Sequence, residues 1–242
     1  MKLDTEFGGK HLRFHVENVV IFCHGLPYEA GSVIEKGYDQ LAKDFAEKGL
    51  NSLIFDFSGT GLSKGDFNLE NWIKDLSSII NEFTSVSLVA FSMGGVVGTY
   101  VAANRDNIRN LVLVGVPCCS NSITEYMLRE IYAHNKLTGV LRGLRDFESF
   151  KKRFLKEMEM YEPKTWIRDV RCPKLIVHGS SDQIIPFEDA EVLFDAAAEP
   201  KYFLKVVNGS HFLRHHKEVM EKIRTWLVKK EKYGMVMQEI FV

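Results

Sequence analysis

The chain has 242 residues, a length that one α/β domain can hold, and 45% of them are hydrophobic and 12% aromatic. A chain of this size and composition can bury a large core, which excludes an intrinsically disordered protein. Its 31 Lys and Arg residues nearly balance 32 Asp and Glu residues, leaving a net charge of −1. Because no excess of positive charge is available to displace counterions from phosphates, nucleic acid is not expected as a partner.

Leader and membrane segments are not expected either. Residues 1–10 mix charged and apolar side chains, so they do not form the apolar stretch of a secretory leader. The longest apolar runs, Val19–Cys23 and Leu111–Val116, fall far short of the roughly 18 residues that span a membrane. We therefore predict a soluble, cytoplasmic protein without stable membrane insertion.

The cysteines do not indicate a metal site or a disulfide framework. Cys23, Cys118, Cys119 and Cys172 form neither a Cys-x-x-Cys pair nor a Cys–His set with metal-ligand spacing. Neighbouring cysteines such as Cys118 and Cys119 rarely bond each other, so free thiols in a reducing compartment are expected. We predict no metal and no cofactor.

Short apolar runs alternate with longer amphipathic stretches along the chain. Residues 3–17 alternate apolar and polar side chains around Gly8 and Gly9, which predicts an antiparallel hairpin at the edge of a sheet. Runs that are apolar at consecutive positions are typical of strands buried on both faces of a parallel sheet. The predicted strands are Val19–Cys23, Ser52–Phe57, Ser85–Phe91, Leu111–Val116, Lys174–His178 and Tyr202–Val207. The predicted helices between and after them are Tyr38–Lys48, Leu69–Phe83, Val96–Ala103, Phe187–Ala197 and His215–Lys230.

This alternation is the pattern of a doubly wound α/β sheet. It breaks between Pro117 and Pro173, where two helices are predicted, Ile123–Ala133 and Phe147–Met158. We interpret residues 118–172 as a helical cap inserted into a core formed by residues 1–117 and 173–242. The aromatic and Met side chains of the cap recur at helical spacing, which more often indicates packing than ligand contact.

A serine stands at a strand-to-helix junction. Ser92 has Ala90 two residues before it and Gly94 two residues after it. This spacing is typical of the nucleophile elbow, a tight turn that exposes a serine and needs small neighbours because it forces two backbones together. Ala90 stands where glycine is usual and adds only a methyl group. The alternative is that Ser92 is an ordinary helix N-cap.

A serine hydroxyl needs a base to take its proton, and the base needs an acid to orient it. Asp182 follows the fifth predicted strand and His211 follows the sixth, in the order Ser, Asp, His that accompanies the elbow. Both stand at carboxyl ends of strands, where open α/β sheets place their sites. Taken singly, Asp182 could be a turn former and His211 a neighbour of a helix cap. Glu188 and Asp189 are competing acids, but they fall within a predicted helix.

An acyl-transfer intermediate also needs N–H donors for its oxyanion. The backbone N–H of Met93, directly after the nucleophile, is one predicted donor. Leu26, in the loop after the first predicted strand, is the other, because Gly25 permits a tight backbone path and Pro27 has no N–H. His24 is interpreted as a structural histidine that braces this loop.

The chain resembles the α/β-hydrolase family over nearly its whole length outside the cap. The segments that carry the resemblance are His24–Gly25, Asp56–Ser63, Ala90–Gly95, His178–Asp182 and Gly209–His211. The resemblance implies the α/β-hydrolase fold, with a mostly parallel central sheet, helices on both faces and a small helical cap. It also implies a cofactor-free serine hydrolase similar to small carboxylesterases, monoacylglycerol lipases and feruloyl-type esterases. Dehalogenases and epoxide hydrolases of the family carry Asp at the elbow, so Ser92 argues against both, while Asp56 resembles a loop anchor.

These residues predict cleavage of a small, largely apolar ester of short or medium acyl chain by Ser92, His211 and Asp182. A peptidase, thioesterase or perhydrolase could use the same triad, and Glu29 is the candidate for holding a substrate amine. A non-catalytic binding protein is a third possibility, although such proteins usually lack one member of the triad. A basic cluster in the cap could favour an acid-bearing substrate, but such charge runs usually face solvent: Arg142, Arg145, Lys151, Lys152 and Arg153.

The tail Met235–Val242 is too apolar to remain in water. Burying large side chains such as Val236, Ile240 and Phe241 is worth roughly 1.5–3 kcal/mol each, so we expect the tail to be ordered. It could pack on its own domain. It could also pair as an added strand with a second chain, which would make the protein a homodimer.

Overall fold

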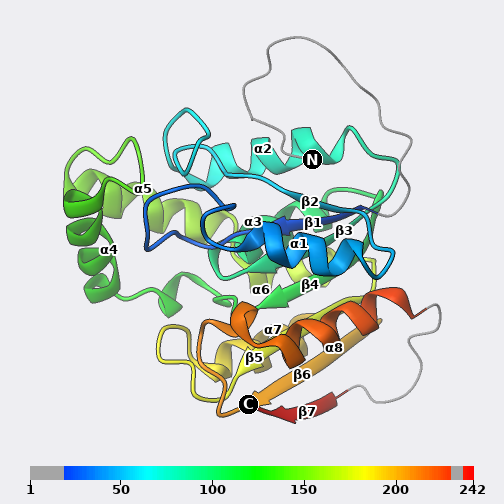
Figure 1. The fold of residues 1–242 in the computed structure, drawn as a ribbon. Helices are drawn as coiled ribbons and strands as arrows, with labels where there is room; N and C mark the ends of the chain where they lie inside the picture. The colour runs from blue at the N-terminus through cyan, green and yellow to red at the C-terminus, as the bar shows by residue number, and fades with distance from the viewer. Residues whose placement is uncertain (1–18, 230–236) are drawn as a thin grey trace.

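The computed structural model describes residues 19–229 and 237–242. Their seven strands form one sheet in the order β2-β1-β3-β4-β5-β6-β7, and each pairing is parallel (Figure 1). The strands are β1 (Val19–Cys23), β2 (Ser52–Ile54), β3 (Val86–Phe91), β4 (Ile108–Val114), β5 (Lys174–Gly179), β6 (Lys201–Val207) and β7 (Met237–Phe241). The hairpin predicted within residues 3–17 lies outside the described residues.

Except for the short α6, which the sequence did not predict, the helices fall close to the predicted stretches. They are α1 (Tyr38–Ala46), α2 (Leu69–Ile80), α3 (Met93–Ala103), α4 (Glu125–Thr138), α5 (Phe147–Met160), α6 (Pro163–Trp166), α7 (Phe187–Ala196) and α8 (Lys217–Val228). The main differences are that α3 begins directly after Ser92 and that β2 ends at Ile54 instead of Phe57. Phe55 and Phe57 are fully buried and pack on each other, so this apolar run reflects burial of a loop and not strand pairing.

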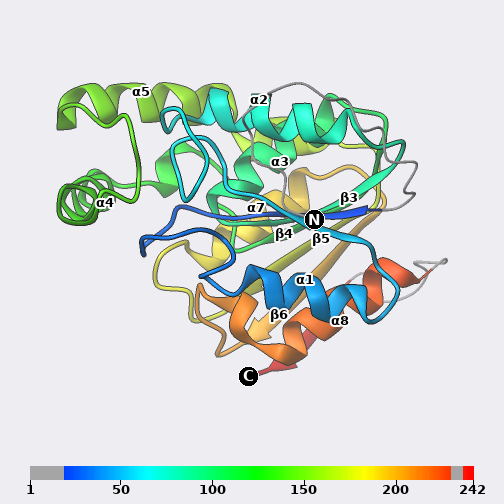
Figure 2. The same cartoon turned by 45° about the horizontal axis from the view of Figure 1, so that its top comes forward.

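Helices cover both faces of the sheet, as the sequence predicted (Figure 2). Along β1, Val19, Ile21 and Cys23 point into one hydrophobic cluster, which also holds residues of α2, α3 and α7. Val20 and Phe22 point into a second cluster with residues of α1 and α8. Consecutive apolar residues are therefore required, because both sides of the strand are buried.

The segment between β4 and β5 carries α4 and α5, which lie beyond the carboxyl ends of the strands (Figure 1). Arg142 joins this segment to the loop that precedes α2: its backbone N–H donates to Gly59 O, and its guanidinium donates to the carbonyls of Thr60, Gly61 and Ser63. Arg142 therefore holds the cap segment on the core and does not belong to a solvated charge run.

The rest of the basic cluster divides between packing and exposure. Arg153 donates to the carbonyl of Phe67, and Lys151 pairs with Glu125 at 2.6 Å. Lys152 and Arg145 are exposed. None of the five basic residues lines the large cavity described below.

The described part of the tail belongs to its own sheet. β7 pairs in parallel with β6, Glu239 pairs with Lys205 at 2.9 Å, and half-buried Ile240 packs against the second cluster. Phe241 is 69% exposed on β7, the last strand of the sheet in the described residues. Packing within the chain is thus present, whereas pairing with a second chain stays a prediction.

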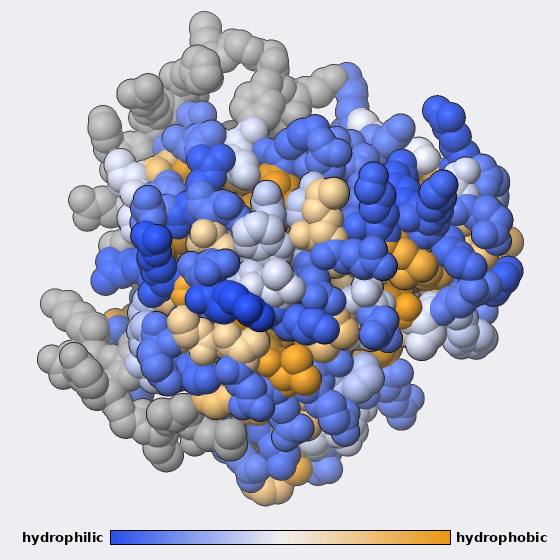
Figure 3. Space-filling view, turned by 180° about the vertical axis from the view of Figure 1, so that it is seen from behind, coloured by the Kyte–Doolittle hydropathy of each residue, from blue (hydrophilic) through white to orange (hydrophobic). Residues whose placement is uncertain are grey.

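Seen from the back, polar side chains cover most of the surface and apolar side chains form small separate groups (Figure 3). No helix in residues 19–229 or 237–242 is both long and apolar enough to cross a membrane.

Candidate active site

The strand order creates a switch point between β1 and β3. From β1 the chain passes outward to β2, and it then crosses back to β3 on the other side of β1. The loops leaving β1 and β3 therefore diverge at their carboxyl ends and leave a crevice, where open α/β sheets bind ligands. The loop of Gly25 and Leu26 leaves β1 there, and Ser92 directly follows β3.

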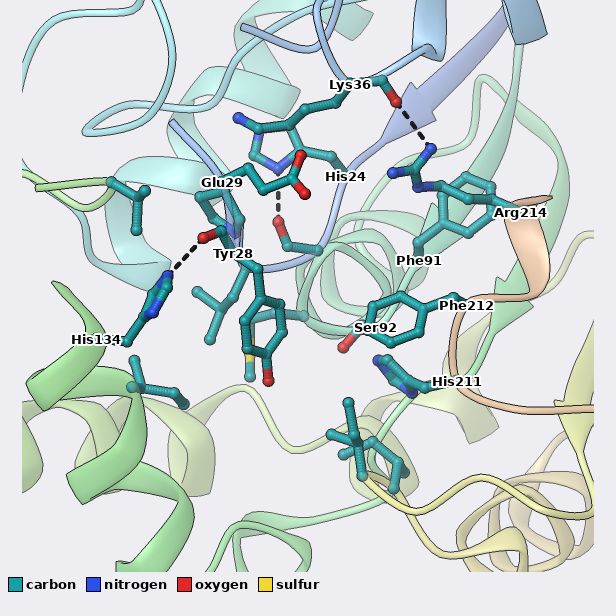
Figure 4. Close-up of a pocket in the computed structure, with 18 of the residues that line it drawn as sticks. His24, Tyr28, Glu29, Lys36, Phe91, Ser92, His134, His211, Phe212 and Arg214 are labelled. Atoms are coloured by element: carbon teal, nitrogen blue, oxygen red, sulfur yellow. Dashed lines mark hydrogen bonds between the residues drawn. The ribbon is translucent and has the colours of Figure 1, made fainter. Parts of the chain in front are cut away.

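Ser92 occupies a strained turn. Its φ of 48° and ψ of −122° are uncommon for a residue with a side chain, and its hydroxyl makes no capping hydrogen bond to α3. Ser92 therefore stands at the N-cap position of α3 but does not cap the helix through its side chain. Its side chain instead lines a large cavity and points toward the imidazole of His211 (Figure 4).

The small residues around Ser92 have separate steric reasons. A Cβ on Gly94 would lie 2.4 Å from the backbone oxygen of His24, so helix α3 can approach the β1 loop only with glycine there. The methyl group of Ala90 faces Gly98, where an added Cβ would lie 3.2 Å away. A glycine one helical turn further along α3 thus provides the space that Ala90 needs.

Asp182 and His211 meet although 29 residues separate them. Nδ1 of His211 lies 2.8 Å from Oδ2 of Asp182, whose side chain is fully buried. Oδ1 of Asp182 accepts the backbone N–H groups of Ile184 and Ile185, both at 2.9 Å. Asp182 is therefore a turn former as well as a partner of His211.

The hydrogen bonds fix the protonation of this pair. Burial alone raises the pKa of Asp182, but hydrogen bonds from His178 and His211, the charge of His211 and the N–H of Ile185 outweigh burial and hold the pKa well below its usual range. An ionised carboxylate can only accept, so Nδ1 of His211 carries the hydrogen. Nε2 of His211 is left with a lone pair that can take a proton.

His24 takes a different part. Its Nε2 accepts the N–H of Phe57 at 3.1 Å, and its Nδ1 lies 2.6 Å from the carbonyl of Gly25. Both nitrogens are occupied, and burial lowers the pKa of His24 to about 4, so the ring is neutral and braces the loop as predicted. It is also packed edge-on against Trp72.

The two predicted oxyanion donors line the same cavity as Ser92. Met93 opens α3, and the first N–H groups of a helix have no acceptor within the helix. Leu26 follows Gly25, where an added Cβ would lie 3.0 Å from Cβ of Ser92. Their backbone groups are thus carried by segments that border the nucleophile, while their role in stabilising an oxyanion stays a prediction.

The cavity has a volume of about 1160 Å³, somewhat above the roughly 300–1,000 Å³ of most small-molecule sites. One wall is apolar and comes mainly from the cap, with Ile123, Tyr126, Met127, Ile131, Val140 and Leu141. Phe150, Phe154 and Met158 of the cap are instead buried in the core. Only some of the cap aromatics and methionines therefore face the pocket, as the sequence predicted.

The other wall is polar, and no sequence motif predicted most of its residues. Arg214 places its guanidinium 4.8 Å from the ring centre of Tyr38 and donates to the carbonyl of Lys36 at 2.8 Å (Figure 4). Burial lowers the pKa of Lys36 and raises that of Tyr38 to about 12. Glu29, singled out from the sequence, also lines the cavity and is exposed.

Two acids weighed in the sequence are placed elsewhere. The buried carboxylate of Asp189 accepts the N–H of Cys118 at 2.9 Å, and Glu188 is exposed on α7. Asp56 is buried and accepts the N–H groups of Val33 and Leu62, so it anchors a loop as predicted. In the described part of the chain, no group of three or more His, Cys, Asp or Glu side chains is arranged to hold a metal ion.

The parallel sheet, the helices on both faces and the serine turn at the switch point define the α/β-hydrolase fold. Solved structures agree. A monoacylglycerol lipase from Paleococcus ferrophilus has a TM-score of 0.68 at 22% identity, with 87% of this chain and 93% of that chain covered. An esterase from Exiguobacterium antarcticum has a TM-score of 0.66 at 19% identity, with 89% and 93% covered. At these identities the likeness shows the fold alone.

Residues 15–143, more than half of the chain, match the family described as serine aminopeptidase, S33, and the chain belongs to this family of α/β hydrolases. Residues 141–234 also match the family described as PhoPQ-activated pathogenicity-related protein. A stretch of 54 residues is 35% identical to the uncharacterized protein YfhR of Escherichia coli K12, which covers 22% of this chain and 19% of YfhR. The aligned part thus spans about a fifth of that relative.

Proposed function

We propose that the protein is a serine esterase that cleaves small carboxylic esters with Ser92, His211 and Asp182. The observation that supports this most is the strained turn of Ser92 in one cavity with His211, whose Nδ1 is bonded to the buried Asp182. Strain at a residue with free access to a pocket is typical of functional sites. Membership of a hydrolase family supports the same conclusion.

In the proposed reaction, Nε2 of His211 takes the proton of Ser92 as its Oγ attacks the ester carbonyl. The N–H groups of Leu26 and Met93 receive the negative charge that develops on the carbonyl oxygen. His211 returns the proton to the leaving alcohol, which gives an acyl-enzyme on Ser92. Water, deprotonated by the same His211, then releases the acid and restores the serine.

The proposed substrates are largely apolar esters of short or medium acyl chain. The cap side of the cavity is apolar and lies on the same cavity surface as Ser92, so it can receive an acyl chain. The flexible side chain of Met127 can adapt its shape to an acyl chain, and the ring of Tyr126 provides a rigid contact surface.

Labelling with a fluorophosphonate tests the nucleophile. We expect one label per chain, on Ser92, because an activated serine needs a base within reach. Peptide mapping by mass spectrometry locates the label, and Ser92→Ala should abolish it and lower kcat on p-nitrophenyl butyrate by at least about 10³-fold. A label on another serine, or none on folded protein, would contradict the assignment.

A second candidate function is favoured by Glu29, which lines the cavity and could hold the amine of an aminoacyl substrate. A panel of p-nitrophenyl esters from acetate to palmitate, compared with aminoacyl p-nitroanilides, separates the two. We expect butyrate to octanoate esters to be preferred over both extremes by at least tenfold in kcat/KM, about 1.4 kcal/mol of transition-state binding. Glu29→Gln should leave ester hydrolysis unchanged. If aminoacyl amides are preferred and Glu29→Gln lowers their hydrolysis, the aminopeptidase replaces the esterase.

A further inference from the structure

A second histidine contacts the carboxylate of Asp182. His178 lies near the end of β5 and is 1% exposed. Its Nε2 is 3.3 Å from Oδ2 of Asp182, the same oxygen that His211 approaches at 2.8 Å. Two imidazole rings therefore share one carboxylate oxygen, and only one of them, His211, lines the pocket.

The partners of His178 define its protonation. Nε2 lies 3.0 Å from the carbonyl of Ile185, which can only accept, so Nε2 carries the hydrogen and shares it between Ile185 and Asp182. Nδ1 is buried and has no hydrogen-bond partner within residues 19–229 and 237–242. A hydrogen on Nδ1 would be a buried donor without an acceptor, so the surroundings favour the tautomer with the hydrogen on Nε2.

The other charged groups on the elements packed around His178 have partners of their own, so Asp182 is the charged group that its ring contacts. Phe187, at the start of α7, packs edge-on against the ring of His178, with the two ring centres 6.0 Å apart. Lys205, in register with His178 on β6, pairs with Glu239. Asp189 on α7 accepts the N–H of Cys118.

The ring of His211 is surrounded by a carboxylate, a glycine backbone and the charged groups of the cavity. Asp182 contacts its Nδ1, and the backbone of Gly115, at the end of β4, lies close to the ring, since an added Cβ there would be 3.3 Å from Nδ1. The cavity that His211 faces carries the charged groups Glu29, Glu35, Lys36, Glu130 and Arg214 and the further histidines His24, His134 and His215.

We propose that His178 is a positioning residue of the triad, a role that rests on the proposed function. Its N–H holds Oδ2 of Asp182 in place for His211 and takes up part of the negative charge on that oxygen. Without this N–H, Asp182 is less firmly oriented and attracts the proton of His211 more strongly. The loss should therefore slow the reaction and move the acid limb of its pH profile to higher pH.

Three variants separate this role from simple packing. His178→Phe keeps a planar ring and removes the N–H, His178→Gln keeps an N–H donor, and Phe187→Leu alters the packing but keeps His178. For His178→Phe we expect kcat on p-nitrophenyl butyrate to fall roughly tenfold with little change in KM. The acid limb of its kcat/KM profile should move up by about 0.5 pH unit. His178→Gln should recover most of the rate, and Phe187→Leu should keep the wild-type pH profile.

Failure of the positioning role of His178 can be told apart from failure of the proposed esterase function. If wild-type protein is neither labelled at Ser92 nor active on esters, the proposed function fails. If wild-type protein is active but His178→Phe keeps its kcat, KM and pH profile, or Phe187→Leu shifts the profile as much, the positioning role is wrong. Should His178→Phe not fold, ¹⁵N-histidine NMR of wild-type protein decides. His178 must be the Nε2–H tautomer at the pH of the assay, and an Nδ1–H tautomer overturns the proposal.

Discussion

At the scale of single residues, three histidines in and around the site have different partners and therefore different chemistry. His211 has a carboxylate on one nitrogen and the pocket on the other side of its ring. His178 shares its single N–H with that carboxylate and is closed off from the pocket. His24 uses both nitrogens on backbone groups. Residue type alone does not separate these roles, because the partner of each nitrogen sets the tautomer.

The burial of His24 predicts a pH dependence of stability. The pKa of His24 is lowered from 6.5 to about 4 in the folded protein, so the unfolded chain takes up its proton first as the pH falls. The free energy of unfolding should therefore decrease between about pH 6.5 and pH 4, by up to ~1.4 kcal/mol per pH unit from this group. Below pH 4 this contribution no longer changes.

Urea unfolding of wild-type protein and His24→Gln at several pH values measures this effect. Gln keeps an acceptor for Phe57 N–H but does not titrate, so the variant should be less stable at pH 7 and should lose part of the slope between pH 6.5 and 4. Parallel curves for the two proteins would show that His24 is not the group responsible.

At the scale of elements, helix α3 and the loop after β1 approach each other at one glycine. Gly94→Ala places a methyl group 2.4 Å from a backbone oxygen, which cannot move as a side chain end would. We expect a loss of about 1–3 kcal/mol in stability and a larger loss of activity, because the displaced loop carries Leu26.

Gly98→Ala is the matched control on the same helix. Its added Cβ would lie 3.2 Å from the methyl group of Ala90, so a small shift relieves the contact. Thermal unfolding and kcat/KM should change less than in Gly94→Ala. Equal effects of the two substitutions would mean that helix propensity, and not the close approach at the elbow, governs this helix.

At the scale of the whole molecule, the tail closes the sheet at one edge. Deleting the residues after Gly234 removes β7 and uncovers β6, so stability should fall by about 1–3 kcal/mol. Light scattering coupled to size-exclusion chromatography measures whether the mass in solution also falls from a dimer to a monomer.

Two point variants separate packing of the tail on its own chain from pairing of the tail with a second copy. Ile240→Ser should lower stability if the tail packs on its own chain, because Ile240 contacts the second cluster. If the exposed side of β7 pairs with a second copy of the chain, Phe241→Ser should lower the mass in solution from that of a dimer toward that of a monomer. A monomer whose stability is unchanged by the deletion would contradict both roles of the tail.

The sequence alone predicted the α/β sheet, the helices on both faces and the cap segment, because these follow from local periodicity and from strands buried on two sides. It also singled out Ser92, Asp182 and His211, since each stands at the end of a predicted strand beside turn-forming residues. Small neighbours such as Gly94 were recognisable because a tight turn tolerates few residue types.

Only the tertiary structure decided the contacts between segments that are distant in sequence. Arg142 bonded to the loop before α2, and Arg214 bonded to Lys36, join segments that lie far apart in the sequence. The contact of His178 with Asp182, only four residues away, depends on how the chain folds at the end of β5. It also decided where strand β2 ends, because Phe55 and Phe57 are buried by aromatic packing without strand pairing. Hydrogen bonds to specific atoms and packing between distant segments leave no periodic pattern, so a sequence does not display them.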